Sequence, residues 1–175
     1  CACLAVLAFY VDRSATAKQA FATAWLFALA WLIGSIWWLF ISMHRYGGLA
    51  APLAALAVGL MAMGLAIFYG AAAAVHHAVC NKKVSVLARA AAFSAVWVLA
   101  EMVRGTLWTG FPWGAVGYAH VDGVLHLWAP WVGVYGLCAM TAFFAMALVA
   151  ERQDHRPFSR TAQIGVFGLV LAVAY

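Results

Sequence analysis

The chain has 175 residues, of which 68% are hydrophobic and only 9% are charged, and its net charge is +5. A soluble domain carries about 25% charged residues, so this composition excludes an ordinary soluble protein. The apolar runs are continuous, which also excludes a transmembrane barrel, because barrel strands alternate apolar and polar residues. The sequence therefore predicts an all-α fold, a polytopic transmembrane helix bundle.

The apolar sequence divides into six segments separated by short polar stretches. We expect helices at residues 1–10, 20–42, 52–79, 84–103, 132–150 and 161–175. One bilayer crossing needs about 20 residues, so the first and last segments are short, and we expect both to be truncated. Residues 1–175 would then form a single transmembrane helical domain.

Most of the basic residues lie in alternate loops. Eight of the ten Lys and Arg residues fall in loops 11–19, 80–89 and 151–160. The loops at 43–51 and 104–131 hold the other two. The positive-inside rule therefore places the first three loops in the cytoplasm and the last two on the outer side. An aromatic belt is expected at that outer side, formed by Trp37, Trp38, Trp108, Trp113, Trp128 and Trp131.

One stretch combines charge with residues that interrupt a helix. Residues 97–118 have the sequence W-V-L-A-E-M-V-R-G-T-L-W-T-G-F-P-W-G-A-V-G-Y. Glu101 and Arg104 are three residues apart, so they can pair on one helical face. Charges at membrane depth are costly and mark either a structural contact or a site. The pair could position a polar head group at the outer leaflet, or it could tie the helix to the following loop.

The segment after this pair is rich in glycine and aromatic residues. Residues 109–114 can form a re-entrant or interfacial loop, because Pro112 removes a backbone donor and favours an extended Phe111. Such a loop could form the floor or gate of a lipid-accessible cavity. The alternative is an aromatic anchor at the membrane interface.

Other candidate residues follow no specific pattern. His120, Asp122 and His126 could suggest a metal or acid–base cluster, but their spacing matches no motif, and an exposed outer loop is the alternative. His76 and His77 end a helix, and we expect them at the membrane interface. No zinc-ligand spacing is found among the cysteines, which are Cys1, Cys3, Cys80 and Cys138. We predict no metal or cofactor, and nothing indicates nucleic-acid binding.

The region 97–137 resembles the apolipoprotein N-acyltransferases, a family of bacterial inner-membrane enzymes that complete lipoprotein maturation. The family pattern is W-x-x-x-E-x-x-R-G, then L-T-G-F-P-W, then G-Y, then A-P and a glycine-rich helix start. It stands here as Trp97, Glu101, Arg104, Gly105, residues 109–113, residues 117–118, Ala129, Pro130 and Gly133. Trp108 stands where the family often has Leu.

The resemblance implies transfer of an acyl chain from a phospholipid to the α-amino group of a diacylglyceryl-modified N-terminal cysteine. It also implies a bacterial inner membrane location, with loops 43–51 and 104–131 periplasmic. A periplasmic nitrilase-like domain with a Glu-Lys-Cys triad would follow residue 175. The cysteine would carry the acyl chain as a thioester. No catalytic residue is therefore assigned to this chain, and the segment alone is expected to be inactive.

The expected partners are the phospholipid acyl donor and the apolipoprotein acceptor, with the protein a monomer. The candidates for lipid-proximal residues are Glu101, Arg104, Phe111, Pro112, Trp113 and Tyr118. A small transporter or channel subunit is the alternative, and it would show broken helices near the membrane midplane and an internal repeat. In a third interpretation, a membrane scaffold, the charged pair would matter only for folding.

Overall fold

The computed structural model describes residues 2–80, 84–107 and 109–154. Within these residues the structure is helical and has no strand, which confirms the all-α prediction. The α-helices are α1 (Ala2–Asp12), α2 (Ala17–Ser35), α3 (Trp37–Ile41), α4 (Ala51–Val79), α5 (Val86–Thr106) and α6 (Ala129–Asp154). Four helical segments are long and apolar enough to cross a membrane: α2, α4, α5 and Val124–Arg152. The helix expected at 161–175 lies outside the described residues.

The polar loop expected at 11–19 is shorter than predicted. Helix α1 continues to Asp12, and α2 begins at Ala17. Thr16 caps α2, because its hydroxyl oxygen accepts a hydrogen bond from the Gln19 backbone N–H at 3.2 Å. The Gln19 side chain in turn accepts from the Ala15 N–H at 2.9 Å. This reciprocal capping resembles a capping box and accounts for the earlier helix start.

The continuous helix expected at 20–42 is broken. Ile36 leaves the helical conformation, with φ −106° and ψ 13°, and separates α2 from α3. The hydroxyl of the preceding Ser35 donates to the Trp31 carbonyl oxygen at 2.9 Å. Such a bond to the previous turn, next to a Gly–Ser pair, commonly bends a helix. A π-helical turn, η1 (Ser42–Tyr46), then shortens the loop expected at 43–51.

The long outer connection expected at 104–131 is also shorter and more ordered than predicted. Helix α5 extends to Thr106, so Arg104 is a helical residue. Two 3₁₀ helices follow, η2 (Val116–His120) and η3 (Val124–Trp128), and α6 begins at Ala129. Near its start α6 is kinked at Gly133, where φ is 63°. The kink gives residues 129–132 a different direction from the rest of α6.

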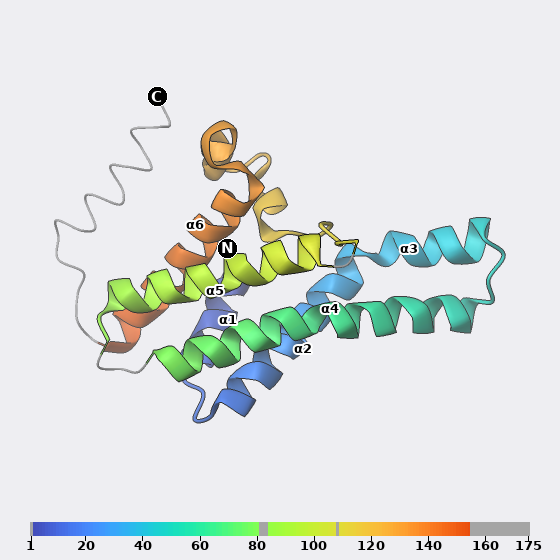
Figure 1. Cartoon of the computed structure of the whole chain (residues 1–175). Coiled ribbons are helices and arrows are strands. Elements are labelled where there is room, and N and C mark those ends of the chain that lie inside the picture. The colour runs from blue at the N-terminus through green and yellow to red at the C-terminus, as the bar shows by residue number, and fades with distance from the viewer. Residues whose placement is uncertain (1, 81–83, 108, 155–175) are drawn as a thin grey trace.

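Two helix pairs form most of the bundle, α2 with α4 and α5 with α6. Figure 1 shows α3 and the first part of α4 extending beyond the ends of α5 and α6. Both helices of the first pair bury alanines four positions apart, and such small residues let two helices approach closely. These alanines are Ala20, Ala24 and Ala28 of α2 and Ala62 and Ala66 of α4.

A buried ion pair joins α1 to α5 at the end of α5 opposite to Thr106. Arg89, which the expected loop 80–89 and the expected helix 84–103 both include, lies in the first turn of α5 and is 1% exposed. Its guanidinium contacts the Asp12 carboxylate at the end of α1. His76, in the last turn of α4, is also buried within the protein, with its ring edge-on to Phe93 at 5.3 Å. Pairing with Asp12 explains how α5 accommodates an arginine inside the bundle.

This ion pair makes a prediction about stability. Arg89→Met should lower the free energy of unfolding by about 3–5 kcal/mol, because it leaves the Asp12 charge buried without its cation. Thermal unfolding in a mild detergent measures the effect. Arg45→Met is the matched control, because Arg45 is exposed in η1. Equal stability of the two variants would contradict the assignment of Arg89 to the bundle interior.

Candidate functional site

The charged pair at the end of α5 is fully enclosed. Glu101 is 0% exposed and Arg104 is 2% exposed. The Arg104 Nη2 donates to Glu101 Oε2 at 2.7 Å. Burying two charges is costly unless their remaining hydrogen-bonding groups also find partners. The remaining hydrogen bonds of Glu101 and Arg104 therefore determine which segments the pair holds together.

Arg104 connects three parts of the molecule through one guanidinium group. Its Nε donates to the Tyr69 hydroxyl of α4 at 2.9 Å. Its Nη1 donates to the backbone carbonyl oxygens of Phe111 and of Trp113, the latter at 2.8 Å. The planar guanidinium offers five N–H donors in a fixed arrangement. The position of Arg104 therefore fixes the loop relative to both α4 and α5.

The backbone of the loop completes this arrangement. The Phe111 N–H donates to the Arg104 carbonyl oxygen at 2.9 Å, so Arg104 and Phe111 bond to each other twice. The Val116 N–H donates to Glu101 Oε1 at 3.3 Å. Gly110 makes the turn with φ 71°, and a Cβ there would collide with the Gly105 carbonyl oxygen. Only glycine fits this position, which explains one residue of the T-G-F-P-W sequence.

Tyr69 is the site residue that the sequence analysis missed. It lies 35 positions before Arg104 and is 0% exposed. Its ring packs against Trp97 at 4.9 Å and Trp31 at 5.4 Å between ring centroids. The only signal in the sequence was a phenol within an apolar helix, and a phenol in the membrane interior needs a hydrogen-bond partner.

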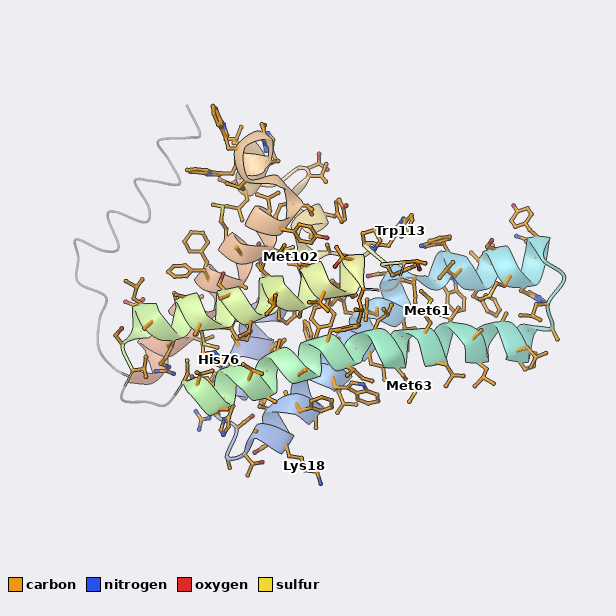
Figure 2. The ribbon with its side chains drawn as sticks, viewed as in Figure 1. Lys18, Met61, Met63, His76, Met102 and Trp113 are labelled. Carbon is orange, nitrogen blue, oxygen red and sulfur yellow. The ribbon has the colours of Figure 1, made fainter. Side chains whose placement is uncertain are left out.

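The predicted aromatic candidates differ in how they relate to the pair. Phe111 and Trp113 contact Arg104 through their backbone, and their rings lie 5.4 Å apart. The Trp113 ring is 54% exposed and approaches Trp38 of α3 at 6.2 Å. Figure 2 shows Trp113 at the end of α5, on the side of α3. Pro112 is exposed on the loop, and Tyr118 is exposed on η2. The loop therefore directs two carbonyl groups to Arg104 and exposes the Trp113 ring, whereas the Phe111 ring packs against the core.

An apolar groove of about 520 Å³ lies between α4 and this loop. Its volume is within the ~300–1,000 Å³ common for small-molecule sites. Its α4 wall consists of Leu60, Met61, Gly64, Leu65, Ile67 and Phe68. Its other wall consists of Arg104, Leu107, Thr109, Gly110 and Phe111. The lining is almost entirely apolar, so the groove suits a hydrocarbon chain rather than a polar ligand.

His120, Asp122 and His126 do not form the suggested metal cluster. Among the described residues, no group of three or more His, Cys, Asp or Glu side chains is arranged to hold a metal ion. His120 is not in an exposed loop, since it is 8% exposed and its Nε2 lies 2.7 Å from the Thr141 hydroxyl. That hydroxyl donates to the Leu137 carbonyl oxygen, so it accepts from His120. This contact fixes η2 to α6.

Comparison with known proteins gives a consistent result. The sequence profile of the family described as the apolipoprotein N-acyltransferase N-terminal domain matches residues 1–147. The apolipoprotein N-acyltransferase of Verminephrobacter eiseniae is 48% identical over 166 residues, which cover 91% of the chain and 29% of that relative. The enzyme of the same name from Ralstonia nicotianae is 42% identical, over 87% of the chain and 30% of the relative. The chain thus spans about a third of the length of the curated relatives it matches.

The contact between His120 and Thr141 predicts a pH-dependent stability. Burial lowers the pKa of His120 from its usual value of 6.5. The unfolded chain then binds a proton more readily, so the stabilising contribution is present above about pH 6.5 and is lost as the pH falls below it. Thermal unfolding from about pH 8 to about pH 5 should show this loss. His120→Gln should flatten the dependence, whereas His126→Gln, an exposed control in η3, should leave it intact.

Proposed function

Because the chain belongs to the apolipoprotein N-acyltransferase N-terminal domain family, we propose that it is the membrane domain of such an enzyme. The enzyme would transfer an acyl chain from a membrane phospholipid to the N-terminal cysteine of a lipoprotein. This domain would anchor the catalytic part and hold the lipid. The family match over residues 1–147 and the groove beside the loop support this proposal.

The proposed orientation places the loop on the periplasmic side of the bacterial inner membrane. The basic loops near residues 11–19, 80–89 and 151–160 would then face the cytoplasm, as the positive-inside rule requires. Three exposed tryptophans lie near the C-terminal end of α5, which is the end opposite to the basic loops. They are Trp37, Trp38 and Trp113. Exposed tryptophans at one end of a bundle favour the membrane interface there.

We place the acyl chain of the phospholipid in the groove between α4 and the loop. The groove is apolar, it borders lipid-exposed side chains of α4 such as Leu60 and Ile67, and it ends at the loop. Exposed Pro112 and Trp113 would lie beside the lipid head group. Glu101 and Arg104 would act on the lipid only through the loop that they hold, since their polar groups are already bonded to protein.

We propose that the nucleophile of the reaction lies outside this chain. Acyl transfer through a thioester needs a thiolate. Cys138 is buried in α6, where its sulfur accepts from the Gly117 N–H at 3.1 Å. Partial burial raises the pKa of the Cys80 thiol, and Cys80 lies at the far end of α4 from the groove. Neither cysteine offers an activated thiolate near the groove.

The distribution of helix breaks favours this function over transport. A transporter would need discontinuous helices near the membrane midplane. The break at Ile36 follows the last residue of α2, and the kink at Gly133 lies in the second turn of α6. Gly114 of the loop lies against Ser35, so the break at Ile36 is level with the loop, and α3 and the first part of α4 continue beyond it. The helix breaks therefore shape the region around the loop and do not form a path for a transported substrate through the bundle.

Filling the groove tests the proposed function. Gly64 lines the groove, and a Cβ there would meet nothing within 4 Å, so a larger side chain can leave the backbone there without a clash at its first carbon. In the full-length enzyme that carries this segment, Gly64→Leu should raise the KM for long-chain phospholipids by about tenfold, because several buried methylenes lose their site. Short-chain phospholipids should be less affected.

Gly59→Leu is the matched control. Gly59 lies on the same helix, its Cβ position is equally open, and it does not line the groove. Both substitutions raise helix propensity to the same degree. Equal acyl-chain dependence in the two variants would contradict the assignment of the groove to the acyl chain.

A further inference from the structure

The two walls of the groove are connected behind it by one side chain of α4. Phe68 lines the groove, whereas the next residue, Tyr69, is fully buried on the other side of the same helix turn. The Tyr69 hydroxyl accepts the hydrogen bond from Arg104 Nε at 2.9 Å. Arg104 in turn holds the Phe111 and Trp113 carbonyl oxygens of the opposite wall. A continuous polar connection therefore runs from α4 to the loop.

The Tyr69 ring is itself held in place by aromatic packing. It packs against both Trp31 of α2 and Trp97 of α5, whose rings also stack on each other, and all three rings belong to the buried core or border it. A buried ring in contact with two larger rings has little freedom to move, so its hydroxyl is a fixed acceptor. Because the core fixes the position of this hydroxyl, the hydroxyl in turn fixes the position of the Arg104 guanidinium that donates to it.

We propose that Tyr69 is a positioning residue that sets the width of the groove by orienting Arg104. This inference rests on the proposed function only in assigning the groove to an acyl chain. The guanidinium is planar, so fixing Nε fixes the directions of Nη1 and Nη2 as well. With Nε held by Tyr69, Nη1 points to the loop carbonyls and Nη2 to Glu101.

The hydroxyl is the part of Tyr69 that matters for this role. Tyr69→Phe keeps the ring and its packing but leaves the Arg104 Nε–H buried without an acceptor. A buried donor without a partner drives rearrangement toward any available acceptor. The guanidinium would then rotate, and the loop that depends on it would move relative to α4.

The first test measures the distance between the two walls directly. Spin labels at Met63 of α4 and at Thr109 of the loop report on the groove, and both positions are exposed. Figure 2 shows Met63 on α4, pointing away from the side on which Met61 lies, so that its label would stay outside the groove. The accessible native cysteines are first replaced by serine. In Tyr69→Phe the distance distribution should broaden and shift, whereas Tyr10→Phe, an exposed control on α1, should match the parent protein.

The second test measures acyl transfer by the full-length enzyme. Tyr69→Phe should raise the KM for the phospholipid by about tenfold with a nearly unchanged kcat, because loss of one charge-assisted hydrogen bond misplaces the lipid site without touching the reacting groups. A purely structural role would instead reduce the amount of folded enzyme and leave the KM of the folded fraction unchanged.

The two tests separate the possible failures. A changed distance distribution in an enzyme whose activity does not depend on phospholipid would support the role of Tyr69 and overturn the proposed function. An unchanged distribution and an unchanged KM would overturn the role of Tyr69 alone. A Tyr69→Phe protein that does not fold would also overturn it, because the hydroxyl would then be a folding requirement rather than a positioning group.

Discussion

The buried guanidinium of Arg104 is the interaction on which the outer end of this bundle depends. A charged group inside a membrane protein is tolerated only when its donors are bonded and its charge is matched. Tyr69, Glu101 and the carbonyl oxygens of Phe111 and Trp113 meet that requirement, and they come from α4, α5 and the loop. The loop has its observed path because the arginine needs those carbonyl groups. The Trp113 ring, which the guanidinium does not contact, remains exposed, and the Phe111 ring packs against the core.

The opposite end of the bundle also holds a buried arginine that is paired with a carboxylate. Arg89 pairs with Asp12, which connects α1 to α5. Between the two ends, alanines of α2 and α4 let the helices pack closely. The result is a scaffold with polar contacts at both ends and an apolar groove at one of them. In the proposed enzyme a bundle held by these contacts would present an acyl chain at a constant position, which proximity-based catalysis requires.

The sequence predicted the helical fold and the principal charged pair, and the limits of the prediction have physical causes. The i, i+3 spacing of Glu101 and Arg104 is a local signal, and their pairing followed from it. Tyr69 gave no such signal, because its partner is distant along the chain and close only in the folded bundle. Arg89 was assigned both to the loop 80–89 and to the helix 84–103, because charge counting does not distinguish a loop from the first turn of a helix. The break at Ile36 depends on one hydroxyl bond of Ser35, which composition does not reveal.

The central claim is that the pair of Glu101 and Arg104 holds the loop in place against α4 and α5. Hydrogen exchange of individual backbone amides tests it most directly, because the Phe111 N–H bonds to the Arg104 backbone carbonyl and the Val116 N–H bonds to the Glu101 carboxylate, so both bonds depend on the position of the loop. In the parent protein both amides should exchange slowly. In Arg104→Met both should lose protection while amides in the middle of α5 keep theirs. Unchanged protection of Phe111 and Val116 in Arg104→Met would contradict the account.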